Sequence, residues 1–463
     1  MKTKFVTTSI AYINAEPHIG FLFELLAADI FARHWRSQSE DSFFLTGTDE
    51  HGAKVASAAT TAGLARQQFA DQISGKYLAL KEQFDLSFDY FIRTTAPTHQ
   101  EFVKQTWRTL LQAGQIKKGI YRGRYCTGCE AFKQPSEIAD NHCLVHNQPL
   151  EKVEEENYFF EPGGIITQKI ADWINYRLWP SSRRQEAINV LHTGAFKQIS
   201  VSRPATKNSW GIGVPDDPSQ VIYVWFDALL NYLSIEKITG QKLWPADIQI
   251  IGKDILKFHA IVWPAILLAL GRDLPAALLV HGFINVDGRK LSKSTGHIVR
   301  PQELLDHYAL AGDLAVDAVR YLLFRQLSFY DDSNFVWAEF DTLYNGELAN
   351  GLGNLVARVI GIGKKVAKFE LPQPAIDRLA VAKLDFKDHL ETANERINQA
   401  DSIITAEKLW ENSNDKLTKF NEVVSCLVEA TGILLPFMPK TAGEIRRQLT
   451  ELKSKPLFPR LNQ

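Results

Sequence analysis

The chain of 463 residues contains few cysteines and shows no excess of charge of either sign. It has 4 cysteines, and its 52 Lys and Arg residues are balanced by 53 Asp and Glu residues, so that the formal net charge is -1. So few cysteines exclude a small disulfide-rich scaffold. The balanced charge excludes a general attraction of the whole molecule to polyanions. Any binding of nucleic acid must therefore come from local basic patches.

Long apolar runs are missing as well. Residues 1–8 hold too short an apolar run for a signal peptide, and no segment approaches the roughly 18 consecutive apolar residues of a membrane span. We therefore expect a cytoplasmic protein with no membrane partner. Hydrophobic residues make up 45% of the chain, which is typical of a globular protein, and the length allows about two to four domains.

Short apolar runs alternate with helical patterns in two separate parts of the chain. Strands that alternate with helices favour a parallel sheet, so we predict an α/β domain built from two halves. The predicted strands are residues 5–10, 43–45, 248–251 and 278–281, and the predicted helices are residues 19–31 and 255–270.

A stretch of about a hundred residues interrupts this pattern and holds three of the cysteines, so we predict an insertion between the two halves. From Ala311 onward apolar residues recur at helical spacing, which predicts an all-helical C-terminal domain. The predicted boundaries are 1–115 and 221–285 for the two halves of the α/β domain, 116–220 for the insertion, 286–340 for a connecting region and 341–463 for the helical domain.

Two segments carry residues suited to binding phosphate. Residues 15–20 lie where the first strand meets the first helix, and the free N–H groups and positive dipole at a helix start attract phosphate. Residues 288–296 hold two lysines among hydroxyl residues, which can neutralise the charge of a leaving pyrophosphate. Taken alone, a histidine at a helix start is more often a cap or a surface residue, and the second segment is equally well explained as a solvated basic loop. The candidate phosphate-binding residues are His18, Gly20, Lys290, Ser292, Lys293 and Ser294.

The three clustered cysteines predict a metal site. Cys126 and Cys129 form a Cys-x2-Cys pair, and Cys143 and His146 form a Cys-x2-His pair a short loop later. Three thiolates and one imidazole suit tetrahedral Zn2+ with no open position, so we predict one structural zinc in a knuckle at about residues 122–150. The alternative is a set of unligated buried cysteines.

The two phosphate segments together resemble the paired signatures of the class I aminoacyl-tRNA synthetases. Further motifs, in order along nearly the whole chain, narrow the resemblance to the methionyl-tRNA synthetase family. They are Ala11-Tyr12-Ile13-Asn14, Gly47-Thr48-Asp49-Glu50-His51-Gly52, Tyr223-Val224-Trp225-Phe226-Asp227-Ala228, Gly252-Lys253-Asp254 and His281-Gly282. The resemblance implies a Rossmann-like parallel-sheet catalytic domain, split by a connective insertion with a zinc knuckle and followed by an all-α anticodon-binding bundle.

The resemblance also implies the reaction and its substrates. ATP, accompanied by Mg2+, would react with L-methionine to give methionyl-adenylate, and the methionyl group would pass to the 3' adenosine of tRNA(Met). Aromatic rings suit a methionine pocket because sulfur makes favourable contacts with ring edges, although aromatics in a sheet protein are more often core. The implied pocket residues are Ile10, Tyr12, Asp49, Arg203, Trp225, Ala228, Leu229, Tyr232 and His281.

In the helical domain, the resemblance assigns Asn354, Arg358 and Trp410 to reading the CAU anticodon, with the tryptophan stacked on a base. The alternative is an amphipathic bundle whose exposed polar residues bind nothing. Basic pairs at 117–118, 122–124, 183–184 and 364–365 are candidates for tracking the tRNA backbone. No further module follows the helical pattern, so we expect a monomer.

One position departs from the family pattern. The first signature usually ends in a second histidine, but here the residue is Phe21, which cannot donate a hydrogen bond. Losing one such donor typically costs about 3 kcal/mol of transition-state stabilisation, or roughly a hundredfold in rate. A degenerate synthetase-like protein that binds tRNA or methionine without efficient activation therefore stays open as an alternative, as does another class I specificity such as cysteine or leucine.

Overall fold

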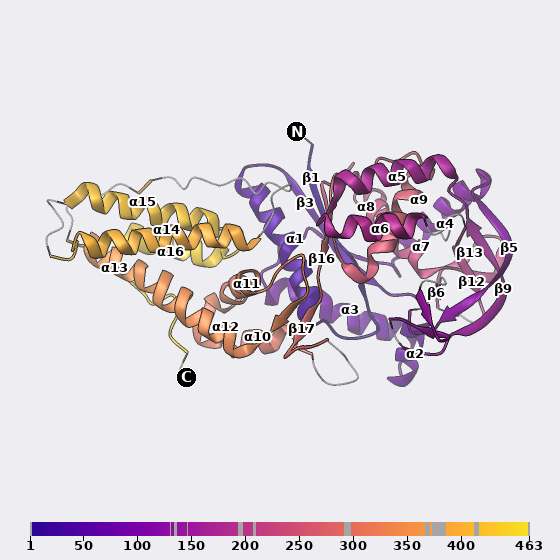
Figure 1. The fold of residues 1–463 in the computed structure, drawn as a ribbon, viewed down its shortest axis with the longest axis horizontal. Helices are drawn as coiled ribbons and strands as arrows, with labels where there is room; N and C mark the ends of the chain where they lie inside the picture. The colour runs from indigo at the N-terminus through magenta and orange to yellow at the C-terminus, as the bar shows by residue number, and fades with distance from the viewer. Residues whose placement is uncertain are drawn as a thin grey trace.

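A seven-stranded parallel sheet forms the centre of the α/β part of the molecule (Figure 1). The computed structural model describes residues 2–129, 131–133, 137–145, 147–192, 198–206, 210–290, 298–365, 371–372, 386–411 and 416–461. The strand order is β10-β16-β15-β1-β3-β2, with β4 also paired to β3. The strands are β1 (Lys4–Thr8), β2 (Ala11–Tyr12), β3 (Ser42–Asp49), β4 (Tyr90–Arg93), β10 (Leu178–Trp179), β15 (Ile248–Gly252) and β16 (Leu278–His281).

Both faces of this sheet are buried, which explains why its strands are apolar throughout. Val6 and Phe44 point into one apolar cluster, and their neighbours Phe5 and Leu45 point into the other, as the two-residue period of a strand requires. The first cluster contains α1 (Ile19–Ser37). The second contains residues of α4 (Pro97–Gln112), α8 (Asn231–Thr239) and α9 (Trp263–Ala269). The predicted α/β fold is confirmed.

The segment 116–220 forms a largely antiparallel lobe beside the sheet. Its long hairpin pairs β5 (Ile116–Cys126) with β9 (Glu151–Phe160). The same segment also contributes one strand to the main sheet. This strand, β10, lies between α5 and α6 in the chain and pairs in parallel with β16. The other elements of the segment are β6 (Ala131–Lys133), β7 (Ile138–Ala139), β8 (His142–Cys143), α5 (Gly164–Arg177), α6 (Ser182–His192), β11 (Ile199–Ser200), β12 (Ser202–Pro204), β13 (Gly213–Val214) and β14 (Asp217–Ile222).

Helices build the elongated end of the molecule, as predicted (Figure 1). A short strand, β19 (Ser333–Phe335), interrupts them and pairs in parallel with β17 (Ile284–Val286), which also pairs with β18 (Arg289–Lys290). The helical elements after β18 are α10 (Pro301–His307), η4 (Ala309–Leu314), α11 (Ala315–Gln326), α12 (Trp337–Leu343), η5 (Tyr344–Gly353), α13 (Asn354–Gly363), α14 (Phe386–Ala406), α15 (Leu417–Leu434) and α16 (Pro439–Glu451).

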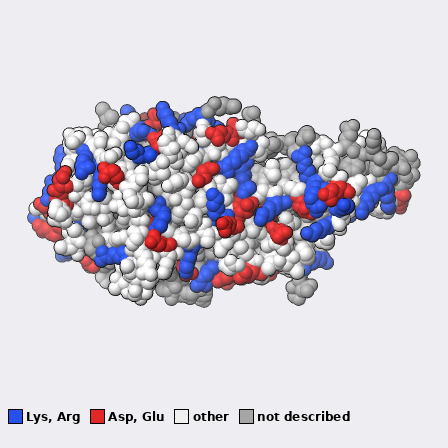
Figure 2. Space-filling view, turned by 180° about the vertical axis from the view of Figure 1, so that it is seen from behind, with Lys and Arg blue, Asp and Glu red and all other residues white. Residues whose placement is uncertain are grey.

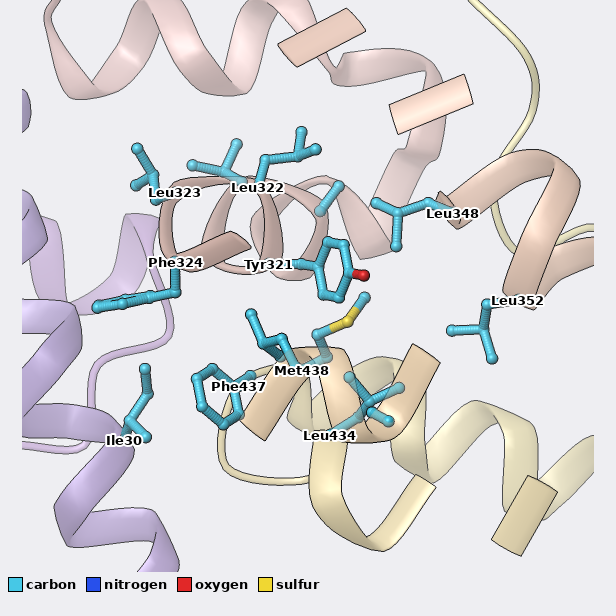
Figure 3. Packing of buried hydrophobic residues seen from close by; sticks show 14 of the residues in the cluster. Ile30, Tyr321, Leu322, Leu323, Phe324, Leu348, Leu352, Leu434, Phe437 and Met438 are labelled. Atoms are coloured by element: carbon cyan, nitrogen blue, oxygen red, sulfur yellow. The ribbon is translucent and has the colours of Figure 1, made fainter. Parts of the chain in front are cut away.

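A continuous core joins α1 to the helical end. Phe23 of α1 stacks on Phe324 of α11 at 4.7 Å, and Figure 3 shows Phe324 beside Phe437 from the turn before α16. Within this core, Arg320 Nη2 lies 2.6 Å from Asp29 Oδ2 of α1, and Arg320 Nε donates to the Phe437 carbonyl at 2.7 Å. Breaking a buried pair of this kind costs about 3–5 kcal/mol, so the contact holds α1 in a fixed place against the bundle.

Charged side chains of both signs are interspersed over the surface seen in Figure 2, in agreement with the small net charge. Among the described residues, no helix is both long enough and apolar enough to span a bilayer.

Candidate active site

The carboxyl ends of β1, β3, β15 and β16 meet at one edge of the sheet. Ser9 and Ile10 follow β1, while Asp49, Gly252 and His281 end the other three strands. Open parallel sheets bind ligands outside this edge, where neighbouring strands connect in opposite directions. We therefore take this edge as the candidate active site.

His18 caps the start of α1 at this edge. Its Nδ1 atom accepts a hydrogen bond from the Gly20 N–H at 3.1 Å, so the hydrogen of the neutral ring is on Nε2. Gly20 is half-buried in the first turn. The ring nitrogen that can donate and the N–H groups of the first turn thus belong to one helix start, which is suited to binding phosphate.

The second predicted phosphate segment is only partly visible. Ser292, Lys293 and Ser294 lie outside the described residues, and of Lys290 only the backbone is described, paired with Asn285 in the β17–β18 hairpin. The chain beyond the segment returns to α1, because the Val299 carbonyl accepts a hydrogen bond from the Ile19 N–H at 3.0 Å. Arg300 Nε lies 3.9 Å from Glu16 Oε2 just before the same helix. The described flank therefore reaches the helix start that carries His18.

Three of the predicted pocket residues lie on β1, β2 and β3 or next to them. Tyr12 and Asp49 are direct partners in the β2–β3 ladder, and Ile10 is half-buried between β1 and β2. The Tyr12 hydroxyl lies so close to Gly52 that a Cβ atom there would come within 2.5 Å of it. Gly52 also has φ +114°, which residues with a side chain rarely adopt. Both the close hydroxyl group and this backbone conformation therefore require glycine at position 52.

The predicted pocket residues of α7 (Val224–Leu229) and α8 lie against a π-helical turn, η3 (Phe258–Val262). Trp225 stacks on Phe258 with 3.7 Å between ring centres, and the Tyr232 hydroxyl lies 2.9 Å from His259 Nε2. Ala228 and Leu229 are buried on α7.

His259 is neutral in this arrangement. Burial lowers its pKa to about 4. Its Nδ1 atom is 3.2 Å from the Ile255 carbonyl and therefore carries the hydrogen, so Nε2 accepts from Tyr232. Phe258 and His259 were not among the predicted site residues, because they lie in an apolar helical run typical of core. The one sequence signal was a histidine inside that run.

His281 contacts Glu24 of α1. Its Nε2 atom lies 3.1 Å from Glu24 Oε2, and its Nδ1 atom lies 2.8 Å from the Gly282 carbonyl. The other Glu24 oxygen accepts from the Ser9 N–H at 2.6 Å and the Ser9 hydroxyl at 2.7 Å. Burial opposes protonation of His281, but the Glu24 carboxylate outweighs it and raises the pKa of the imidazole. Glu24 was missed because a single acidic residue in a buried helix pattern gives no signal of its partner.

Arg203 is buried beside the residue that precedes α7. Its Nη1 atom donates to the Ser200 hydroxyl at 2.7 Å and to the Ser202 carbonyl at 2.8 Å. Its guanidinium lies 4.3 Å from the centre of the Tyr223 ring. These contacts link the lobe formed by residues 116–220 to the start of α7.

The three clustered cysteines are close enough to share one metal ion. Their sulfur atoms all lie within 4.8 Å of one another, and Cys129 Sγ is 3.6 Å from Cys143 Sγ. Cys126 and Cys143 are buried, whereas the predicted fourth ligand, His146, lies outside the described residues. Three thiols in this geometry can hold a metal ion that prefers sulfur.

Two of the three predicted anticodon residues, Arg358 and Trp410, form contacts within the helical domain. Arg358 of α13 pairs with Asp401 of α14, and Lys365 Nζ donates to the Trp410 carbonyl at 3.1 Å. Trp410 is 43% exposed, which is unusual for so large an apolar side chain. Asn354 is exposed one helical turn before Arg358.

Several basic residues of the insertion form ion pairs with acidic residues. Lys118 Nζ lies 2.7 Å from Glu156 and 3.0 Å from Asp217, and Arg122 lies 3.0 Å from Glu154. Lys117 and Arg183 likewise pair with glutamates. This hairpin surface is therefore not an open basic stripe.

Comparison with known proteins gives one consistent result. A family model described as tRNA synthetases class I (M) matches residues 4–139 and 126–360. Methionine–tRNA ligase of Caldanaerobacter subterraneus subsp. tengcongensis is 37% identical over 482 residues, which cover 97% of this chain and 74% of that protein. Methionine–tRNA ligase of Rickettsia conorii is 36% identical over 492 residues, which cover 99% of this chain and 95% of that protein.

A solved structure agrees with these relatives. The Mycobacterium tuberculosis methionyl-tRNA synthetase in complex with methionyl-adenylate superposes with a TM-score of 0.82 and 33% sequence identity. The match covers 100% of this chain and 99% of that one.

Proposed function

The chain belongs to the methionine–tRNA ligase family of class I tRNA synthetases, and from this premise we propose that its strand-end site activates L-methionine with ATP and charges tRNA(Met). Methionine and ATP give methionyl-adenylate and pyrophosphate, and the methionyl group then passes to the 3' adenosine of the tRNA. The observation that carries this proposal is the similarity of sequence and fold over nearly the full length of the chain. The position of His18 supports it, because the start of α1 lies beside the residues that follow the segment 288–296.

Positioning and charge stabilisation supply most of the catalysis. The methionine carboxylate is itself the nucleophile that attacks the α-phosphorus, so no covalent enzyme intermediate is required. His18 Nε2 and the N–H groups around Gly20 would donate to phosphate oxygens. Lys290, Ser292, Lys293 and Ser294 are the proposed partners of the leaving pyrophosphate. Mg2+ bound to ATP would neutralise part of the phosphate charge, and it needs no dedicated protein cage.

The methionine pocket is proposed to lie between the strand ends and α7–α8. Asp49 carries the charge that suits the substrate ammonium group. The stacked Trp225 and Phe258 rings and the Tyr232–His259 pair suit the thioether. Such a pocket discriminates a missing methyl group by only about 1–3 kcal/mol, so homocysteine should enter it. Ile10, Tyr12, Arg203, Ala228, Leu229 and His281 complete the proposed set.

A structural zinc in the knuckle is the proposed cofactor. The three clustered thiols fit Zn2+ in a site with no open position, and His146 is the proposed fourth ligand. When bound, the ion would cross-link the two knuckle turns. Lys54 of α2 (Ala53–Thr61) donates to the Gly128 carbonyl between two of these cysteines, and Lys257 Nζ lies 3.6 Å from Glu137. These two contacts join the knuckle to the α/β domain.

The helical end is the proposed reader of the CAU anticodon. The exposed Trp410 ring would stack on a base, and Asn354 and Arg358 would bind base edges. The proposed location is the cytoplasm, and the proposed state is a monomer.

One observation favours a second candidate function, a binder that activates methionine poorly. Phe21 packs edge-on against Tyr77 at 5.3 Å between ring centres, so the position where relatives offer a donor is occupied by a ring in an apolar contact. This candidate keeps methionine and tRNA as ligands and loses only efficient catalysis.

Charging of a tRNA(Met) transcript with radiolabelled methionine and ATP separates the two candidates. Acid-precipitable methionine that depends on ATP supports the ligase. Methionine binding in equilibrium dialysis without any charging, in zinc-containing and correctly folded protein, supports the binder.

A further inference from the structure

A buried chain of hydrogen bonds runs behind the proposed methionine pocket. His51 Nδ1 lies 2.7 Å from one oxygen of Asp227, and His99 Nε2 lies 2.8 Å from the other. His99 Nδ1 continues the chain to the Ser234 hydroxyl at 2.8 Å. All four residues are at least 95% buried, so no bulk water competes for these bonds.

Three of the four residues in this chain of hydrogen bonds lie close in sequence to a proposed pocket residue. His51 is two residues after Asp49, Asp227 is two residues after Trp225, and Ser234 is two residues after Tyr232. The chain therefore connects three separate elements of the pocket: the loop after β3, the helix α7 and the helix α8.

His99 is the exception, because it belongs to α4, which carries no proposed pocket residue. It is the third residue of that helix, and its ring reaches both Asp227 and Ser234. A residue that touches no substrate group but joins two pocket helices is placed to fix their spacing.

The charge state of Asp227 makes these bonds strong. A carboxylate only accepts hydrogen bonds, so both imidazoles must donate to it. Burial alone would raise the pKa of the Asp227 carboxyl, but the contacts with His51 and His99 outweigh burial and lower it. Removing one donor would leave a buried carboxylate oxygen without its partner, which forces the surrounding elements to move.

We propose that His99 and Asp227 are positioning residues for methionine, which hold the Asp49 loop, α7 and α8 at the spacing that the substrate requires. This proposal rests on the pocket given under the proposed function. The proposed phosphate-binding residues lie at the start of α1 and in the segment that begins with β18, outside the chain of hydrogen bonds, so the proposed role concerns methionine and not ATP.

Two substitutions of His99 with similar volume test the proposal. His99→Gln can place a side-chain N–H near the position of His99 Nε2 and donate to Asp227, whereas His99→Leu fills the space without a donor. We expect His99→Leu to raise the Kd for methionine in equilibrium dialysis and the KM for methionine by about tenfold, since small displacements of positioning groups have effects of this order. His99→Gln should stay within about threefold of the unaltered protein, and the KM for ATP should change less than about twofold in both variants.

Val103→Ala provides the matched control on the same helix. Val103 is fully buried one turn further along α4, so the change weakens the packing of the helix and leaves the hydrogen bonds intact. If Val103→Ala lowers the melting temperature as much as His99→Leu without raising the Kd for methionine, the positioning role is supported. Equal rises in both variants overturn it.

Other outcomes are equally decisive. An unchanged Kd for methionine in His99→Leu, or equal rises in the KM values for methionine and ATP, overturns the positioning role. If His99→Leu does not fold, Ser234→Ala removes the outer hydrogen bond, and the proposal then requires a rise of about threefold in the same Kd. Failure of the unaltered protein to bind or activate methionine overturns the proposed function instead.

Discussion

The Nε2 atom of His281 lies 3.1 Å from the Oε2 atom of Glu24, and this buried contact joins the end of β16 to the second turn of α1. Because His18 caps the start of α1, the contact connects two strand ends and the proposed phosphate-binding turn through one carboxylate, which also accepts hydrogen bonds from Ser9. The Glu24 carboxylate thus connects several parts of the candidate site.

This pair predicts a pH-dependent stability. The pKa of His281 is raised in the folded protein, so its contribution is fully present below its ordinary value of about 6.5 and is lost as pH rises through the raised value. Replacing Glu24 by Gln should lower the free energy of unfolding by about 1–3 kcal/mol at pH 6 and by less at pH 8.5. Urea denaturation at both pH values measures the difference. A difference that grows toward high pH would contradict the assignment.

Phe21→His introduces the imidazole with which the family's first signature usually ends. We expect the rate of methionine activation to rise by about tenfold to a hundredfold, since one phosphate donor is worth about this much. The loss of the Phe21–Tyr77 ring contact should lower stability by about 1 kcal/mol. Pre-steady-state formation of methionyl-adenylate measures the rate. An unchanged or lower rate would show that the site is built around the phenylalanine ring.

Cys143→Ser should remove the metal from the knuckle. Purified protein is expected to contain about one zinc per chain, and the variant should lose most of it together with part of its thermal stability, because binding of a structural metal contributes folding energy. Elemental analysis and melting curves measure both effects. Cys426→Ser is the control, since Cys426 is buried in α15 among apolar residues. Equal zinc content in the two variants would contradict the predicted ligand set.

Trp410→Ala should separate tRNA recognition from catalysis. Loss of one stacked base costs about 1–3 kcal/mol, so kcat/KM for tRNA charging should fall about tenfold to a hundredfold, while methionine activation without tRNA stays the same. Tyr176→Ala removes an even more exposed aromatic ring, which lies on α5, and should change neither rate. A normal charging rate for the Trp410 variant would exclude this residue from anticodon binding.

The sequence predicts the parts of the fold that rest on local pattern. The first strand and α1 follow from apolar runs of different period, and the three cysteines come together as their spacing indicates. Helix α16 lies within the predicted helical domain, and its buried residues Ala442, Ile445 and Leu449 recur at helical spacing. Strand β10 has only two residues and gives no recognisable pattern.

The features of the site that could not be predicted from the sequence are contacts between residues far apart in the chain. Asp227 belongs to a recognisable motif, but its partner His99 is 128 positions away and comes from a helix with no motif. Likewise, Glu24 and His281 are 257 positions apart. Such pairs depend on how the helices pack on the sheet, which no single stretch of the chain encodes.

Exchange of radiolabelled pyrophosphate into ATP, with a panel of amino acids, tests the central claim most directly. The account predicts exchange that requires methionine, is not supported by cysteine or leucine, and falls at least about a hundredfold in His18→Ala. Exchange driven by another amino acid, or no exchange above background from folded and zinc-loaded protein, would contradict it.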